Sequence, residues 1–372
     1  MLRVMILKEE VKMKQGLKTV EELYQKLEQQ RSARKDLIAD TRSLVVNTTE
    51  GATMLNVSTG EDVLSYRISD IAHRQMAERL GIPYKYYDRM RQEYPMLLDR
   101  NINGWLLKNP EKRMLRTLDG RLRAFLSDRY RRLDNLELMD HVLPVIAKMR
   151  GCEIISSAIT ESHLYLKVLN KNMKAEVIPG DVVQAGFVIS NSEVGLGSLK
   201  VEPLVYRLVC KNGLICKDLA QKKYHAGKQV EETDNAYELY SDATLEADDK
   251  AYFMKVQDIV STAVDETRFQ LEVSKLHTAM SIKTEDPIQA VEVLGDKYIL
   301  NKMERASILR HFIMGNDFSQ YGLVNAVTRS SQDIQDYNRA TDIERLGGIL
   351  LEESIEASAD HKNKVIVLSK AG

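Results

Sequence analysis

The chain has 372 residues, above the size at which one hydrophobic core usually stops growing, so we expect two or three domains. Hydrophobic residues make up 44% and charged residues 29% of the chain, and both glycine (19) and proline (7) are sparse. This composition excludes a collagen-like, linker-rich or disordered protein. The formal net charge is −1, and no apolar run approaches the length of about 18 residues that a membrane span needs.

The charge is divided unevenly along the chain. Residues 1–150 carry 28 lysines and arginines against 21 acidic residues, a net charge of +7. The remaining residues carry 25 against 33, a net charge of −8. Such an asymmetry predicts an anionic partner for the basic half.

Residues that build disulfide, metal or catalytic centres are poorly placed for those roles. Cys152, Cys210 and Cys216 are too few for a disulfide framework, and their spacing is not that of a zinc site. The seven histidines form neither an HExxH nor an HxH pattern, and no GxSxG motif is present. We therefore expect reduced thiols in a cytoplasm, no metal and no cofactor. We favour a non-enzymatic protein over an enzyme, while a cluster built from distant residues stays open.

The first region is an N-terminal helical segment (1–48). Thr19 and Glu22 form a capping box that predicts the start of a helix. Residues 44–47 and 54–57 have the composition of short strands.

The second region (49–112) is a small α/β region with helices. Ser69 precedes a helical pattern over residues 70–80, and Gly81 ends it. A cluster of tyrosines follows, and we expect it to form a short helix that ends at Pro95.

The third region (113–216) is the β-rich core. Residues 113–118 and 121–126 flank Asp119-Gly120, which is typical of a tight hairpin. A helix is predicted next, at 135–150. The strands predicted after it are 154–159, 163–169, 182–190 and 199–210.

The remaining regions are a polar acidic loop or hairpin (217–247) and a helical C-terminal region (248–372). The helical patterns in the last region cover 251–280, 287–294, 302–314 and 321–332. Together the five regions predict an α+β fold, with a central antiparallel sheet, a helix packed on it, and a mostly helical C-terminal region.

The hairpin is the most informative part of the sequence for function. With a two-residue turn, Arg116 faces Arg123 and Met114 faces Phe125, so one face gathers Arg116, Arg121, Arg123 and Phe125. Two arginines directly opposite each other are destabilising unless an anion lies between them. Phosphates of a single strand, with bases stacked on Phe125, would supply that anion. The nucleic-acid-binding residues predicted in this way are Arg116, Arg121, Arg123, Phe125, Arg129, Tyr130, Arg131 and Arg132.

Alternatives stay open at each of these positions. The hairpin arginines could instead meet acids of the C-terminal half, or the register could shift. Arg207 lies in an almost wholly apolar run, and it needs either a carboxylate or a bound anion as its partner. The glycine-containing stretch 190–198 could approach a phosphate, but we favour a simple connection between strands.

Three stretches resemble a known family. They are RAFLSDRYRRLDN (123–135), the stretch 181–215 that contains SNSEVGLGS and LVCKNGLI, and YGLVNAVTRSSQDIQDYNRATDIERLGG (321–348). They resemble the phage/plasmid-like proteins grouped as domain of unknown function 932, over about Thr19 to Gly348. The family is carried by bacteriophages, prophages and plasmids, and it implies no activity and no catalytic residues. The strand and helix order around 113–215 is similar to the β-β-β-α arrangement of phage single-strand annealing proteins.

These observations lead to a functional hypothesis. We expect a mobile-element protein in the cytoplasm of a bacterial host that binds or anneals single-stranded DNA in recombination or replication, without catalysing a reaction. We expect it to form a homo-oligomer and to need no membrane. The alternatives are a structural or protein-interaction assembly protein, and an enzyme acting on nucleic acid without a recognisable motif.

Overall fold

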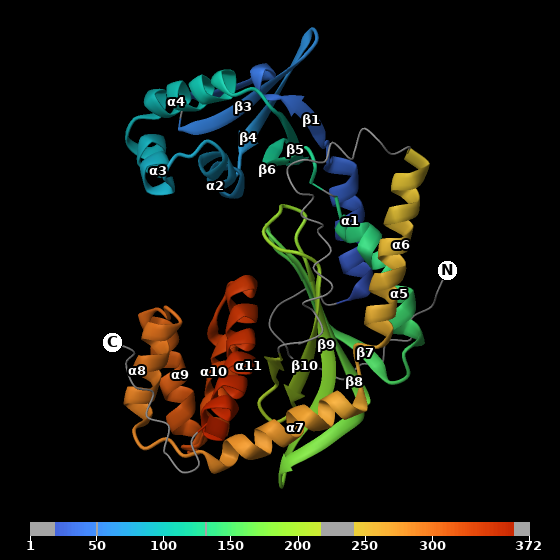
Figure 1. Cartoon of the computed structure of the whole chain (residues 1–372), viewed down its shortest axis with the longest axis vertical. Coiled ribbons are helices and arrows are strands. Elements are labelled where there is room, and N and C mark those ends of the chain that lie inside the picture. The colour runs from blue at the N-terminus through green and yellow to red at the C-terminus, as the bar shows by residue number, and fades with distance from the viewer. Residues whose placement is uncertain (1–18, 50, 131, 217–241, 361–372) are drawn as a thin grey trace.

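The computed structural model describes residues 19–49, 51–130, 132–216 and 242–360, and it confirms the α+β fold class (Figure 1). It contains two sheets, and the described C-terminal region is helical as predicted. Most of the acidic segment predicted at 217–247 lies outside the described residues. No helix in the described ranges is long and apolar enough to cross a membrane.

The first sheet has six strands in the order β1-β5-β6-β4-β3-β2. All neighbours are antiparallel except β4 and β6, which run parallel. The predicted hairpin is therefore inserted between β1 and β4. The strands are β1 (Leu37–Asp40), β2 (Leu44–Thr49), β3 (Ala52–Thr59), β4 (Asp62–Ile68), β5 (Lys112–Leu118) and β6 (Arg121–Ser127), and a short 3-10 helix, η1 (Thr41–Ser43), joins the first two.

Three helices cover one face of this sheet: α2 (Asp70–Arg79), α3 (Tyr84–Glu93) and α4 (Pro95–Lys108) (Figure 1). Ser69 caps α2 as predicted, because its side chain accepts a hydrogen bond from the Ala72 amide at 3.2 Å. Helix α3 ends just before Pro95, close to the predicted end, and a further helix, α4, begins at Pro95. Proline is well suited to the first turn of a helix, where its missing N–H would have no partner, and α4 begins there.

The outer edge of β2 is covered by side chains of α4. The side-chain amide of Asn103 accepts a hydrogen bond from the Val46 backbone N–H at 2.7 Å and donates one to the Val46 carbonyl at 2.8 Å. The Asp99 carboxylate accepts a hydrogen bond from the Thr48 backbone amide, further along the same edge, at 2.8 Å. These contacts satisfy the groups that an edge strand leaves unpaired.

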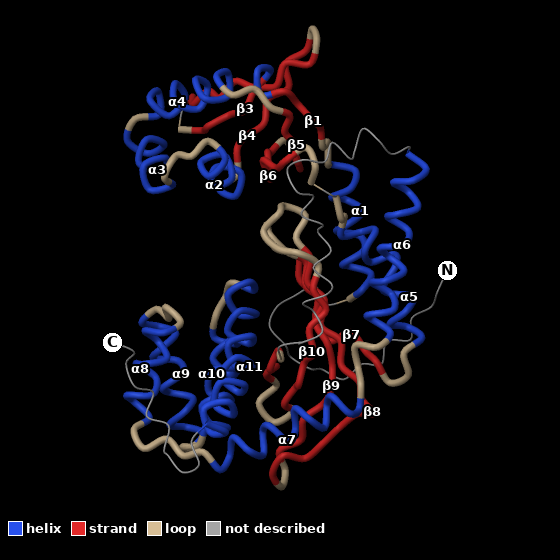
Figure 2. The backbone as a smooth tube through the Cα atoms, in the orientation of Figure 1, coloured by secondary structure: helices blue, strands red, loops and turns tan. Residues whose placement is uncertain are grey.

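The second sheet is an antiparallel meander in the order β11-β10-β9-β8-β7 (Figure 2). Its strands are β7 (Cys152–Ile159), β8 (Leu164–Ile178), β9 (Asp181–Asn191), β10 (Lys200–Arg207) and β11 (Asn212–Ile215). The predicted β-rich stretch 113–216 is thus divided between two sheets. The similarity to a β-β-β-α arrangement is not maintained, because the hairpin pairs with β1 and β4 rather than with β7–β11.

Helices cover both faces of the second sheet. On one face, α1 (Val20–Ala33), α5 (Asn135–Lys148) and α6 (Asp242–Ser261) share a core with β8 and β9 that includes Leu23, Val142 and Phe187. The remaining helices share a second core with Val183 and Val205 of the sheet, and the last of them reaches the opposite face, where Glu344 pairs with Lys167 (Figure 1). They are α7 (Glu266–Ser281), α8 (Pro287–Lys297), α9 (Lys302–Gly315), α10 (Gln320–Ser330) with the short η4 (Ser331–Asp333), and α11 (Tyr337–Asp360).

Two features of the helical region differ from the sequence prediction. The single helix expected at 251–280 is broken into α6 and α7, and the Asp265 side chain caps α7 by accepting from the Arg268 amide at 2.8 Å. Helix α11, with 24 residues, was not predicted as an element. Its inner side packs on the second sheet through Leu346 and Leu350, so its place in the fold depends on tertiary contacts.

Candidate nucleic-acid interface

The β5–β6 hairpin has the predicted turn but not the predicted register. Leu118 faces Arg121 and Thr117 faces Leu122. The register then shifts, so that Arg116 faces Ala124 and the predicted Arg116–Arg123 pair is wrong. The extra residue is Arg123, which forms a bulge on β6. A bulge places two residues opposite one, and it changes the partner of every residue beyond it.

Phe125 lies in the core of the first sheet. It faces Leu115 and is only 3% exposed, beneath the helices that cover the sheet. The Arg113 guanidinium lies 5.7 Å from the centre of its ring. The Phe125 backbone amide donates a hydrogen bond to the Gln75 side chain at 2.8 Å. The ring therefore offers no free face on which a base could stack.

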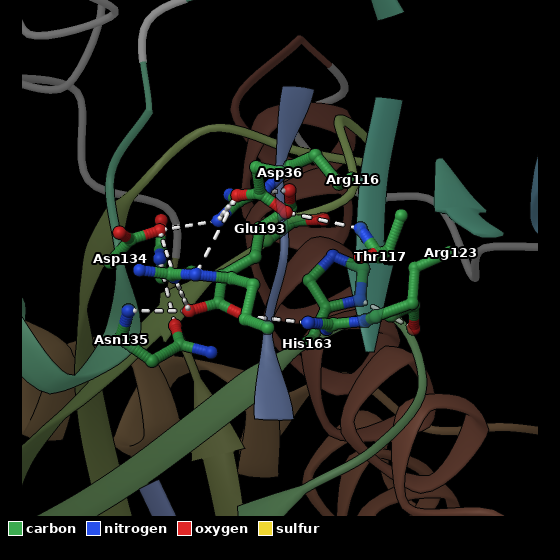
Figure 3. Close-up of polar contacts among 12 residues, drawn as sticks. Asp36, Arg116, Thr117, Arg123, Asp134, Asn135, His163 and Glu193 are labelled. Atoms are coloured by element: carbon green, nitrogen blue, oxygen red, sulfur yellow. Dashed lines mark hydrogen bonds and ion pairs between the residues drawn. The ribbon is translucent and has the colours of Figure 1, made fainter. Parts of the chain in front are cut away.

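Arg116 is fully buried, with 0% exposure, and three oxygen acceptors surround its guanidinium (Figure 3). It donates to Asp36 at 3.0 Å, to Asp134 at 2.5 Å and to the Glu193 backbone carbonyl at 2.9 Å. Burial opposes its charge, but the carboxylates of Asp134 and Asp36 outweigh burial and raise the pKa of Arg116. The guanidinium is a structural cation.

Arg123 is held by Glu193, whose Oε2 accepts from Arg123 Nη1 at 3.0 Å (Figure 3). The other carboxylate oxygen of Glu193 accepts from the Asn135 amide at 2.8 Å, so it caps α5. Asp134 occupies the N-cap position, but its side chain does not accept a capping hydrogen bond from an amide of α5. A residue from a distant loop thus supplies both the cap and an anion at the positive end of the helix.

These contacts form one cluster of three arginines and three carboxylates, Arg34, Arg116, Arg123, Asp36, Asp134 and Glu193, which we call the seam cluster. Arg34 joins it through Asp134, at 2.6 Å. Burial raises the pKa of Asp134, but Arg116 and Arg34 outweigh burial and hold that pKa below its ordinary value. The chain itself therefore supplies the anions that the arginines require. Arg123 thus meets an acid of the C-terminal half, Glu193, as the alternative held, whereas the carboxylates at Arg116 come from Asp36 and Asp134 in the first half.

The loop 190–198 fastens the two sheets together beside this cluster. Val194 packs against Met114, Ala124 and Leu126 of the hairpin, and its carbonyl accepts from Gln75 Nε2 at 2.7 Å. Gly195 has a φ of +74°, and a Cβ there would lie 2.7 Å from the Leu126 side chain. The loop is thus a connection between β9 and β10 that requires glycine for close packing, as the sequence analysis favoured.

A family model described as "Domain of unknown function (DUF932)" matches residues 124–344, more than half of the chain. The chain belongs to the DUF932 family. No curated protein and no solved structure matches it. The match begins within β6 and includes the 190–198 loop, whereas most of the first sheet precedes it.

Three arginines of the predicted binding surface are exposed in this DUF932 protein. They are Arg121, Arg129 and Arg132, and none forms an ion pair with a carboxylate of the described residues. Tyr130 is half-buried against the hairpin, and its hydroxyl donates to the Ser192 carbonyl at 3.1 Å. Arg131 lies outside the described residues.

One further arginine of the first sheet was not predicted as a binding residue. Arg67 of β4 lies directly opposite Arg121 in the parallel β4–β6 pair, and both are exposed. The alternation in DVLSYRI could have predicted β4 as a strand, but a parallel partner far along the chain leaves no local pattern.

Arg207 has a carboxylate partner. Its guanidinium donates to both oxygens of Asp181, at 2.6 and 2.5 Å, and the Tyr321 hydroxyl donates to the same carboxylate at 2.5 Å. Of the two alternatives for Arg207, the structure contains the ion pair. The Arg207 side chain is 19% exposed, so it is less buried than its position in an apolar run of sequence predicts.

Three further features bear on chemistry. A cavity of about 250 Å³ lies beside the seam cluster, lined by cations such as Arg31 and Arg34 and by acids such as Glu137 and Asp140, so its charge favours neither anions nor cations. Among the described residues, no group of three or more histidines, cysteines, aspartates or glutamates is placed to hold a metal ion. Cys152 and Cys210 are half-buried, Cys216 is buried, and all three are free thiols.

Proposed function

We propose that this DUF932 protein binds single-stranded DNA without catalysing a reaction, in the recombination or replication of a phage or plasmid. In this proposal it acts in the cytoplasm of a bacterial host. The observation that supports it is the set of exposed arginines, Arg121, Arg129 and Arg132, without carboxylate partners in the described part of the chain. They lie in the half of the sequence whose net charge is +7. Phosphate contacts of this kind provide affinity without sequence specificity.

The proposed surface is narrower than the surface predicted from sequence. Arg116 and Phe125 are buried, and Arg123 is paired with Glu193, so these three residues stabilise the hairpin. The DNA contacts are assigned to the exposed arginines alone. A positively charged surface can bind the backbone of a single strand without sequence preference.

The test is fluorescence anisotropy of the whole protein with a labelled single-stranded oligonucleotide, titrated over a range of salt concentrations. Each phosphate contact contributes about 0.7 to the slope of log affinity against log salt. The triple variant Arg121→Ala, Arg129→Ala, Arg132→Ala is expected to bind more weakly, with a slope flatter by about 2.

A matched control removes the same charge elsewhere. Arg42, Arg89 and Arg310 are exposed but paired with Asp40, Glu93 and Asp333, and their joint replacement by alanine is expected to change the slope much less. Equal effects of the two triple variants would reject the assigned surface. Absence of binding by the unaltered protein at low salt would reject the function.

A second candidate function is assembly, as a homo-oligomer or with another protein. It is favoured by two exposed apolar side chains: Ile299, between α8 and α9, is 87% exposed, and Met303, in the first turn of α9, is 83% exposed. Ile299 also has a φ of +53°, an unfavourable conformation for a β-branched residue. Light scattering across a concentration series tests this candidate, and a monomeric mass at all concentrations would reject self-association.

A further inference from the structure

The β4–β6 contact places two arginines side by side. Arg67 and Arg121 are partners in the parallel register of these strands. Hydrogen bonds on either side fix this register: the Arg67 amide donates to the Gly120 carbonyl at 3.1 Å, and the Ser69 amide donates to the Leu122 carbonyl at 3.0 Å. Partners on neighbouring strands project from the same face of a sheet, so both guanidiniums leave the sheet in the same direction.

That direction is away from the covering helices. Tyr66, Ile68 and Leu122, which flank the two arginines along their strands, belong to the core beneath α2, α3 and α4. Alternation along a strand therefore sends Arg67 and Arg121 to the opposite face, where both are exposed. The 190–198 loop covers this face near Ala124, and we call the exposed part around Arg67 and Arg121 the open face of the first sheet.

Like charges directly opposite each other on neighbouring strands destabilise a sheet. Elsewhere in the hairpin, the charges of Arg116 and Arg123 are balanced by carboxylates. Neither Arg67 nor Arg121 forms an ion pair with a carboxylate of the described residues. Asp119, the acid nearest to Arg121 along the hairpin, forms none with either of them. No carboxylate of the described residues therefore offsets the repulsion between Arg67 and Arg121, and an anion bound between the two side chains would offset it.

We propose that Arg67 and Arg121 form a phosphate-binding site, in which one phosphodiester of a single strand lies between the two guanidiniums. This inference rests on the proposed function and extends it, because it adds Arg67 and places the strand across the open face of the first sheet. Guanidinium forks match phosphate oxygens in geometry, and binding also relieves the repulsion between the arginines. The site contacts the backbone only, so it does not discriminate between bases.

The first test does not need DNA. Thermal unfolding of the whole protein is followed with and without sodium tripolyphosphate, a small probe with the same chemistry. The unaltered protein is expected to melt at a higher temperature with the probe. In the Arg67→Glu variant the new carboxylate faces Arg121, so this variant is expected to be more stable than the unaltered protein at low salt and to lose the response to tripolyphosphate.

The control variant is Arg89→Glu, which makes the same charge change on α3 and is expected to keep the response. An equal tripolyphosphate response in all three proteins would overturn the site. Lower stability of Arg67→Glu at low salt would also overturn it, because the two side chains would not then face each other.

DNA binding separates this inference from the proposed function. With the anisotropy assay, Arg67→Ala is expected to flatten the salt slope by about 0.7, the contribution of one phosphate. If the unaltered protein binds DNA and Arg67→Ala binds with the same slope, the inference is wrong and the proposed function stands. If the unaltered protein binds no DNA but its response to tripolyphosphate depends on Arg67, the anion site stands and the proposed function is wrong.

Discussion

Arg116 and Arg121 lie on the same short hairpin, yet their surroundings are opposite. Arg116 is fully buried and donates to two carboxylates and a carbonyl, whereas Arg121 is exposed and faces a second arginine. The difference arises from what packs against each end of the hairpin. The segments before β1 and before α5 bring Asp36 and Asp134 to Arg116, whereas the residues opposite Arg121 are Leu118 of β5 and Arg67 of β4. Composition alone cannot distinguish a structural arginine from one that is available to a ligand.

The largest expected effect tests the buried side of this comparison. Replacing Arg116 by alanine leaves Asp36 and Asp134 without their main cation, and breaking a buried pair in this way costs about 3–5 kcal/mol of the free energy of unfolding. Urea denaturation monitored by circular dichroism measures it. Arg121→Ala on the same hairpin is the control, with an expected change below about 0.5 kcal/mol. Similar losses in the two variants would remove the distinction between the two arginines.

A smaller loss of stability is expected when the charge of Asp134 is removed, either by substitution or by low pH. The pKa of Asp134 is depressed in the folded protein, so its contribution to stability is complete above its unfolded pKa of about 3.9 and is lost as the pH falls through the folded pKa. Asp134→Asn is expected to lower the free energy of unfolding by about 1.5–3 kcal/mol near neutral pH, because a hydrogen-bonded charge is removed. The gap between the two proteins is expected to narrow below about pH 4. A gap that stays constant to about pH 2 would contradict this linkage.

The smallest effect has the opposite sign. Arg67→Gln removes one of two opposed cations, so it is expected to stabilise the protein by about 0.5 kcal/mol at low salt. The gain is expected to disappear near 1 M salt, where the Debye length is about 3 Å. Urea denaturation at two salt concentrations checks it. Destabilisation by Arg67→Gln at low salt would show that the arginines do not repel each other.

The parts of the fold that depend on local chemistry could be predicted. Thr19 and Ser69 cap their helices because a side-chain oxygen needs only a nearby amide, and the Asp119-Gly120 turn needs only its own backbone. The bulge at Arg123 and the parallel β4–β6 contact depend on what packs around the strands. No window of neighbouring residues contains that information.

The candidate site divides in the same way. The abundance of arginine between positions 113 and 132 is visible in the sequence, and so is the rule that opposed arginines need an anion. Which arginines are opposed is not visible. The sequence predicts that Arg116 and Arg123 are opposed, but the two arginines that face each other in the structure are Arg67 and Arg121.

The family match starts at residue 124, within β6, and this boundary affects what can be excised. A fragment of residues 124–344 would keep Asp134 and Glu193 but lose Arg34, Arg116 and Arg123, so two carboxylates would face an interior without their cations. It would also lose α1, which covers part of the second sheet, and would cut α11 just before Arg345 and its ion pair with Glu202. The region by which this protein is recognised is therefore not an autonomous module. A fragment intended to fold alone has to begin before α1 and to extend through α11.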